Sequence, residues 1–285
     1  AAGAAVMGVG KSVGVLILGR ALTGVAAATW VPLIGAFSGL FSPAQAVFAT
    51  SLLTFSGSVG RMSATSLTGF LNGVGGYPLA FFLAGAAGVL GAAIVFLTKT
   101  PKAESKGVTF SSIFTLFRRG DVMLPSVISL IAQLGTWAVT FSFMPILAEQ
   151  LGANDVQKSL LLSLNLLAFT IGNLLNTVFV KRIRPIALLV GAFTIFTSGI
   201  VLMVFLRSLA PLYAATAIMG FANGFSYPTL MGLSIQDVEQ SRRTSAMGIH
   251  QSVYAFGMFG GPWIGGALAD RFGIQPMFGI VGGFV

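Results

Sequence analysis

The stretch SAMGIHQSVYAFGMFGGPWIGGALADRFG, residues 245–273, decides the fold because an earlier part of the chain repeats its glycines. The repeat pairs Gly60, Gly69, Gly76 and Gly85 with Gly257, Gly266, Gly273 and Gly282, each 197 positions later. A second block pairs Gly24, Ala26, Pro32 and Ser38 with Gly220, Ala222, Pro228 and Ser234, each 196 positions later. Both copies lie in strongly apolar sequence, so we interpret them as a duplicated membrane unit. Membrane folds built from repeats are mostly transporters, with the substrate site between the repeats.

Composition supports the membrane assignment. The chain is 55% hydrophobic and 8% charged, whereas a soluble domain carries about 25% charged residues. There are no cysteines, which excludes disulfides and thiolate chemistry. One histidine and seven acidic residues argue against a metal centre made of protein ligands. We therefore expect an all-α integral membrane protein without a cofactor.

Apolar segments of about 20 residues predict the spans. They are 14–38, 46–70, 77–98, 123–148, 158–180, 185–206, 210–234 and 245–268, with partial spans at 1–10 and 275–285. Moved back by 196 positions, the helix at 185–206 would begin before Ala1. Moved forward by 197 positions, the helix at 77–98 would end beyond Val285. We expect a fragment of two six-helix halves that lacks about two and a half N-terminal helices and part of the last one.

Lysine and arginine set the predicted orientation. The segments 99–121, 181–184 and 235–243 fall on one side and hold 10 of the 16 basic residues. By the positive-inside rule, this side is cytoplasmic. The net charge of +9 is thus a topology signal rather than a nucleic-acid-binding patch. Within the first segment, residues 108–119 are amphipathic and form either an interfacial helix or a flexible linker.

Four motifs resemble the major facilitator superfamily, and within it the branch of proton-linked drug and sugar exporters. They are Leu16-x-x-x-Arg20-x-x-x-Gly24, Gly257-x-x-x-Gly261-Pro262-x-x-Gly265-Gly266, the run Ala246 to Tyr254, and Gly266-Ala-Leu-Ala-Asp270-Arg271-Phe-Gly273. The fifth-helix copy of the glycine–proline motif departs from the family pattern, because it lacks the proline and carries Arg61.

The resemblance covers the whole chain and implies a domain layout. Residues 1–98 would be the remainder of the N-terminal half, 99–121 the cytoplasmic central loop, and 122–285 the C-terminal half. It also implies a secondary transporter that works by alternating access.

Three side chains are candidates for proton coupling or substrate binding. An arginine at a helix centre costs about 2.5–3.5 kcal/mol to insert, so Arg20 and Arg61 need a cavity or a partner. For Arg20 the resemblance implies proton coupling, and the alternative is a structural hydrogen-bond hub. Arg61 suits an anionic substrate or a structural role. His250 is the sole histidine and can exchange protons near neutral pH, or it is a neutral hydrogen-bonded group between helices.

Amide and aromatic side chains on several helices are candidates for the substrate cavity, as ligand pockets combine a few polar groups with aromatic ones. Each of them can equally serve as a contact between helices. With Arg61, they are Trp30, Gln133, Trp137, Asn165, Asn223, Tyr227, Gln251 and Tyr254.

Small residues and prolines predict close helix packing and conformational change. The set comprises Gly24, Pro32, Gly60, Gly69, Gly220, Pro228, Gly257, Gly261, Pro262, Gly265 and Gly266. A further stretch, Gly8-Val-Gly10-Lys11-Ser12, is similar to the end of a phosphate-binding loop, but the position of the earlier glycine is Ala5. We therefore do not assign nucleotide binding.

The sequence predicts a monomeric transporter of the bacterial cytoplasmic membrane. We expect it to export a small organic molecule in exchange for protons, as a protein that is not an enzyme and binds no nucleic acid. One alternative is a symporter or uniporter for a sugar, organic acid or other metabolite. Another is a transporter-like receptor or scaffold that moves nothing.

Overall fold

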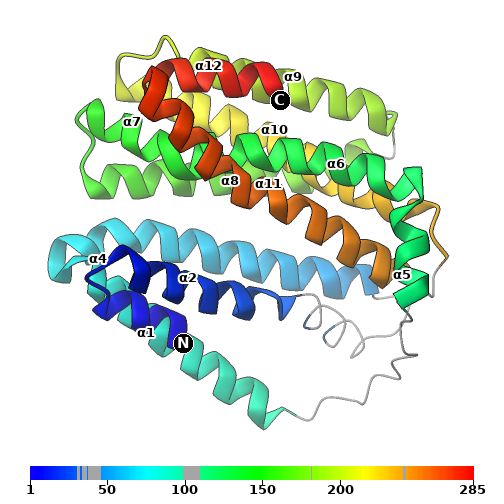
Figure 1. Ribbon diagram of the computed structural model, residues 1–285, viewed down its shortest axis with the longest axis horizontal. Helices are drawn as coiled ribbons and strands as arrows, with labels where there is room; N and C mark the ends of the chain where they lie inside the picture. The colour runs from blue at the N-terminus through cyan, green and yellow to red at the C-terminus, as the bar shows by residue number, and fades with distance from the viewer. Residues whose placement is uncertain (31–32, 34–36, 38–45, 99–109, 181, 240–241) are drawn as a thin grey trace. The chain divides into compact units, whose positions relative to one another are not determined.

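The computed structural model describes residues 1–30, 33, 37, 46–98, 110–180, 182–239 and 242–285. These residues form helices and short turns, and no strand occurs among them. The chain divides into two compact units, Ala1–Ser105 and Lys106–Val285. Figure 1 shows the helices of each unit. Pro32 lies outside the described residues.

The first unit consists of α1 (Ala2–Val9), α2 (Val13–Ala27) and α4 (Ala46–Leu97). Helix α4 bends at Gly76, whose φ of 70° is outside the helical range. A residue with a side chain rarely adopts this φ, whereas glycine does so without strain. The bend separates residues 46–75 from 77–97, close to the predicted gap between two spans.

The second unit begins with α5 (Phe110–Phe117), α6 (Gly120–Gly135), η2 (Thr136–Phe143) and α7 (Met144–Gln150). It continues with α8 (Asp155–Phe179), α9 (Pro185–Leu202), α10 (Leu209–Gln236), α11 (Arg243–Phe272) and α12 (Ile274–Phe284). The element η2 is a π-helix that continues α6 into α7 without a break. Helix α5 falls inside the segment for which an interfacial helix or a linker was predicted.

Four helices in the described ranges are long and apolar enough to cross a bilayer. They are Ser56–Leu97, Gly120–Gln150, Asp155–Phe179 and Pro185–Leu202. Helices α10 and α11 have 28 and 30 residues, which is also enough length, but they are less apolar. The lower hydropathy of these two helices reflects the amides, hydroxyls and glycines that they carry.

The internal repeat recurs in the helix boundaries. Helix α2 begins at Val13 and α10 at Leu209, 196 positions apart. Helix α4 begins at Ala46 and α11 at Arg243, 197 positions apart. A glycine with positive φ stands at the same distance from each of the latter two starts: Gly76, at 70°, forms the bend within α4, and Gly273, at 90°, directly follows α11. The two offsets are those found in the sequence.

The repeat also recurs in helix packing within each unit. In the first unit, a Cβ on Gly85 would lie 3.7 Å from the Cβ of Ala4 in α1. In the second unit, a Cβ on Gly282 would lie 3.2 Å from an atom of Ile200 in α9. Ala4 and Ile200 are 196 positions apart, so equivalent helices touch through equivalent residues.

One pair of contacts shows that side-chain size has been exchanged between the copies. Phe82 fills the space beside Gly8, where a built Cβ would lie 3.0 Å from the ring. At the equivalent place in the second unit, Val204 packs beside Gly279, where the built Cβ would lie 3.4 Å from the valine. The larger residue of the pair lies on α4 in the first unit and in the turn after α9 in the second, while the contact is kept, as close packing requires.

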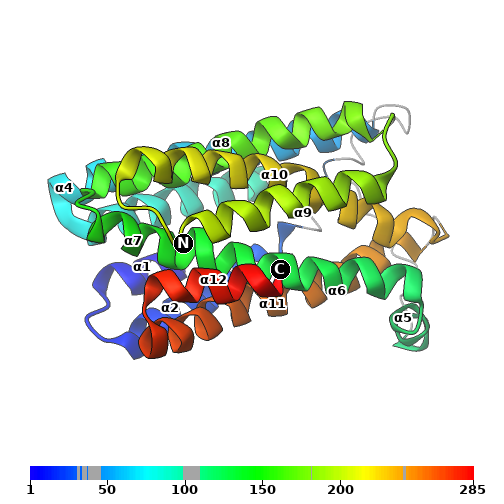
Figure 2. The ribbon, with the colours of Figure 1, turned by 90° about the horizontal axis from the view of Figure 1, so that it is seen from above.

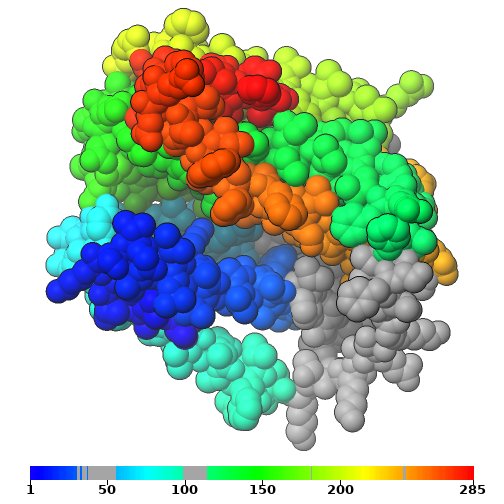
Figure 3. All heavy atoms as spheres, in the orientation of Figure 1, coloured from blue at the N-terminus to red at the C-terminus, as the bar shows by residue number. Residues whose placement is uncertain are grey.

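Glycines bring α11 into backbone contact with α6 and η2. A Cβ on Gly257 would overlap the carbonyl oxygen of Leu130, and a Cβ on Gly261 would meet the carbonyl oxygen of Leu134 and the amide of Ala138. Small residues four apart allow this approach. In Figures 1 and 3, α11 runs diagonally across the second unit and passes beside α6.

A second glycine contact joins α8 and α10, which lie side by side in Figure 2. Gly220 faces the carbonyl oxygen of Asn165, and Gly224 faces that of Phe169. From the opposite helix, Gly172 faces the carbonyl oxygen of Phe221. Neither helix can rotate without bringing a side chain into the backbone of the other.

We predict opposite effects of alanine at two glycines of α11. Gly257→Ala should lower the midpoint of thermal unfolding in detergent, because the added methyl group meets the Leu130 carbonyl. Gly248→Ala is the matched control, since nothing lies within 4 Å of its built Cβ. It should leave stability unchanged or raise it by about 0.5–1 kcal/mol, the helix preference for alanine over glycine. Equal midpoints for the two variants would contradict the contact.

Candidate functional site

A buried polar stripe runs along α6 and into η2. It consists of Ser126, Ser129, Gln133, Thr136 and Thr140, spaced alternately by three and four residues. This spacing places all five on one face of a helix. In a bilayer such groups avoid the lipid and face other helices, and α6 and η2 contact α10 and α11.

His250 of α11 meets this stripe. Its side chain is fully buried. Nδ1 lies 3.1 Å from Oγ of Ser126, and Nε2 lies 3.4 Å from Oγ of Ser129. Both ring nitrogens therefore have a hydroxyl partner on the neighbouring helix. The two serines were not predicted from the sequence, because isolated serines in apolar helices are common.

Aromatic rings extend from the histidine towards α10 and α8. Tyr254 is one turn after His250, and their ring centroids are 6.1 Å apart. Tyr254 meets Tyr227 of α10 edge-on at 6.1 Å, and Tyr227 lies 6.2 Å from Phe169 of α8. Three helices thus contribute to one row of rings, and two of its members were predicted as cavity residues.

Three of the four predicted amides contact a neighbouring helix in this structure. Asn165 donates from Nδ2 to the carbonyl oxygen of Thr216 at 3.0 Å. Asn223 donates from Nδ2 to Oγ1 of Thr136 at 3.0 Å. Gln133 is buried, and Nε2 of Gln251 lies 4.0 Å from the sulfur of Met231.

The π-helix η2 is a part of the site that the sequence did not predict. Trp137 and Phe141 lie on it with ring centroids 5.0 Å apart. Thr136, at its start, still donates to the carbonyl of Ala132 four residues back. Thr140 is buried, and its hydroxyl has no hydrogen-bond partner among the described residues. Single π-helical segments are rare and frequently mark functional positions.

Another polar contact joins α8 to α10. Oγ1 of Thr229 lies 3.2 Å from Oδ1 of Asn176 and 2.7 Å from the carbonyl oxygen of Phe225 in its own helix. The sequence analysis did not select either residue. An asparagine within an apolar helix would have been the available signal, because an amide in a membrane helix needs a partner.

The predicted residues of the first unit lie on its helices as follows. Arg20 of α2 and Arg61 of α4 are exposed. Trp30 is half-buried, with its ring over Gly57. The remaining predicted glycines of this unit differ in surroundings: nothing lies within 4 Å of a Cβ built on Gly24 or Gly60, whereas Gly69 is buried.

The predicted packing residues of α10 and α11 lie in helix interiors. Pro228 is within α10 and Pro262 within α11. A Cβ built on Gly265 would lie 3.1 Å from the ring of Phe143 in η2, and one on Gly266 would lie 3.9 Å from it. The motif around Pro262 therefore packs against the π-helix.

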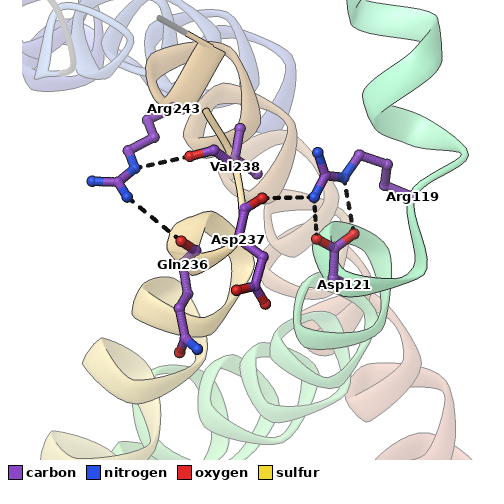
Figure 4. Close-up of polar contacts among 6 residues, drawn as sticks. All are labelled: Arg119, Asp121, Gln236, Asp237, Val238 and Arg243. Carbon is purple, nitrogen blue, oxygen red and sulfur yellow. Dashed lines mark hydrogen bonds and ion pairs between the residues drawn. The ribbon is translucent and has the colours of Figure 1, made fainter. Parts of the chain in front are cut away.

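Arginines cap the end of α10 at the predicted cytoplasmic side (Figure 4). Arg119 forms an ion pair with Asp121 and donates to the carbonyl oxygen of Asp237 at 2.8 Å. Arg243 donates to the carbonyl oxygen of Val238 at 3.0 Å and to that of Gln236 at 3.5 Å. The last carbonyls of a helix lack partners within it and carry partial negative charge. Basic residues predicted as a topology signal thus also hold the end of α10.

The described residues contain no group of three or more potential metal ligands. Their polar groups are hydroxyls, amides, aromatic rings and one imidazole inside a bundle of apolar helices.

A sequence profile of the Major Facilitator Superfamily matches residues 126–285, more than half of the chain.

The chain belongs to the Major Facilitator Superfamily. It is accordingly a multi-pass membrane protein and a secondary transporter rather than an enzyme. The sequence prediction of the family and of the all-α fold is confirmed.

Solved structures of another transporter share the fold of this chain. A crystal structure of a variant of the E. coli fucose:proton symporter FucP is similar, with a TM-score of 0.66 and 17% identity. The match covers 99% of this chain and 78% of that one. A crystal structure of FucP in the outward conformation has the same TM-score and sequence identity to this chain, and the match covers 77% of that structure's chain. At this identity the likeness shows the fold alone, and a comparison with curated proteins finds no match.

We predict that Asn223 and Thr136 stabilise the second unit through a shared hydrogen bond. In a double-mutant cycle of Asn223→Ala and Thr136→Val, measured by unfolding in detergent, the two changes should couple by about 0.6 kcal/mol, as is typical between membrane helices. Thr194→Val is a control, because that hydroxyl bonds only to its own helix, to the carbonyl of Val190. Strictly additive effects for Asn223 and Thr136 would contradict the bond.

Proposed function

We propose that this protein exports a small organic molecule in exchange for protons, by alternating access. The observation that carries the proposal is the buried His250 between Ser126 and Ser129, which places an exchangeable proton in a contact between two membrane helices. A group that gains or loses a proton there changes the interaction between α6 and α11. This is the kind of differential contact that can bias one conformation over another.

The proposed cavity-lining groups favour an uncharged or weakly polar substrate. Tyr227, Tyr254 and Trp137 supply aromatic surface, and Gln133, Asn165, Asn223 and Gln251 supply amides. A few polar groups among rings suit molecules with both apolar faces and hydrogen-bonding groups. Trp30 and Arg61 would contribute from the N-terminal half, and Arg20 is proposed to assist proton coupling.

In this proposal, residues 1–98 belong to the N-terminal half and 122–285 to the C-terminal half, with 99–121 as the cytoplasmic connection. The two halves would rock about the substrate. Contacts made by glycine allow helices to slide because no side chains interlock across them. The glycines of α11 and α10 would supply such surfaces, with Pro228 and Pro262 as bends.

One observation favours a second candidate function. Two similar structures are of FucP, a fucose:proton symporter. A proton symporter or a uniporter for a sugar, organic acid or other metabolite is therefore the main alternative. The excess of basic residues on one side supports placement in a bacterial cytoplasmic membrane with that side inward. We further propose that the protein acts as a monomer.

Proton flux into vesicles distinguishes these functions. The protein would be reconstituted with the pH-sensitive dye pyranine inside, and ethidium or L-fucose would be added outside. Antiport predicts that the lumen becomes more alkaline, since protons leave as the compound enters. Symport predicts acidification, and uniport predicts uptake of radiolabelled compound without a pH change. His250→Gln should reduce the rate of the pH change at least tenfold while the protein still folds.

Gly248→Ala serves as the matched control variant for this assay, because nothing contacts a Cβ at that position. A pH response in His250→Gln equal to that of the unaltered protein would contradict the proton role of His250. Absence of protein-dependent flux, together with absence of thermal stabilisation by a wider panel of sugars, organic acids and lipophilic cations, would instead favour a receptor or scaffold.

A further inference from the structure

The hydrogen bonds around His250 determine which ring nitrogen carries the proton. Oγ of Ser126 lies 2.6 Å from the carbonyl oxygen of Val122, to which it donates. A serine hydroxyl has one proton, so Ser126 has none left to give to the ring. At the 3.1 Å contact with Nδ1, Ser126 therefore accepts, and Nδ1 must be the donor.

The second contact completes the assignment. In a neutral imidazole one nitrogen donates and the other accepts. With the proton on Nδ1, Nε2 presents a lone pair to Ser129, whose Oγ lies 3.4 Å away. We infer that Ser126 and Ser129 position His250 as the Nδ1–H tautomer, which leaves Nε2, facing Ser129, as the proton-accepting atom of the site. The tautomer assignment is independent of transport, and its use in coupling rests on the proposed function.

Proton uptake then has a defined consequence. The lone pair of Nε2 takes the proton and forms an N–H bond, and the imidazole becomes a cation. Ser129 must change from donor to acceptor, so its hydroxyl proton has to turn away from the ring. A carbonyl of the preceding helical turn is the usual acceptor for a serine in a helix, as Val122 already is for Ser126. The bond from Nδ1 to Ser126 is unchanged.

The surroundings make this change costly unless the helices respond. His250 is fully buried, and a buried charge without an opposite charge is strongly disfavoured. In the described part of the second unit, the titratable neighbour on its own helix is Tyr254, with Tyr227 of α10 beyond it. The elements η2 and α12 carry no titratable side chain.

Charged groups lie only at the ends of the helices that pack here. Arg243 is seven residues before His250 on α11, about 10 Å along the axis. Arg119 and Asp121, at the start of α6, are paired with each other. Protonation of Nε2 thus places a single positive charge in the α6–α11 contact, which favours a state in which this contact is hydrated or occupied by an anionic group.

Nitrogen NMR of the histidine ring tests the assignment directly. The protein would be labelled with ¹⁵N-histidine and reconstituted in nanodiscs, and the His250→Gln variant would identify the resonances. At neutral pH we expect a protonated-type ¹⁵N shift for Nδ1 and a lone-pair-type shift for Nε2. The reverse pattern, an equal mixture of tautomers, or an imidazolium pattern would each overturn the inference.

Serine variants separate the two positions. Ser126→Ala should move the population towards the Nε2–H tautomer, because the acceptor for Nδ1–H is lost. Ser129→Ala should leave the proton on Nδ1. Ser252→Ala is the control, since this exposed serine of α11 donates to Gly248 of its own helix, and its spectrum should match that of the unaltered protein. Identical tautomer populations in Ser126→Ala and Ser252→Ala would overturn the positioning role of Ser126.

The outcome is distinguishable from failure of the proposed function. If the Nδ1–H tautomer is found but His250→Gln keeps its pH response in vesicles, the tautomer stands and the proton role of His250 fails. If the tautomer is reversed but the pH response is lost in His250→Gln, the proton role stands and the assignment fails.

Discussion

The direct backbone contact of α11 with α6 and η2 is the constraint on which the second unit depends. Gly257 and Gly261 place the backbone of α11 against carbonyls of Leu130 and Leu134. This approach fixes the rotation of α11, and the rotation places His250, two turns earlier, against the serines of α6. A bulkier residue in the contact would separate the helices and with them the polar groups. Packing and chemistry are therefore set by the same few glycines.

Much of the fold could be predicted from sequence, because the repeat and the apolar segments are strong signals. The offsets found from Gly24 and Gly60 reappear in the starts of α10 and α11. The bend at Gly76 also fell near the predicted gap. The π-helix could not be predicted, because Thr136 to Phe143 have no composition that distinguishes a π-helix from an α-helix. Its contact with Gly265, through Ala138 and Phe143, joins residues far apart in sequence and becomes visible only in the structure.

The sequence predicted the site residues whose types are rare in apolar helices, and it missed those whose types are common there. A lone histidine or an amide in an apolar helix is conspicuous, so His250, Asn165 and Asn223 could be selected. Their partners are hydroxyls and backbone carbonyls, which occur throughout the chain and become identifiable only when the helix contacts are known. The same holds for Arg119 and Arg243, whose charge indicates topology while their role at the end of α10 depends on tertiary contact.

Cysteine pairing tests the α11–η2 contact most directly, since the chain contains no cysteine of its own. A Cβ built on Gly265 would lie 3.3 Å from the Cβ of Ala138, close to the separation of about 3.5–4.5 Å in disulfides. The protein carrying Ala138→Cys and Gly265→Cys would be treated with a mild oxidant in membranes and analysed by mass spectrometry for free thiols. The account predicts a disulfide in nearly all molecules and none in a Gly191→Cys, Gly248→Cys pair. Two thiols that remain free and react with maleimide in the first pair would contradict it.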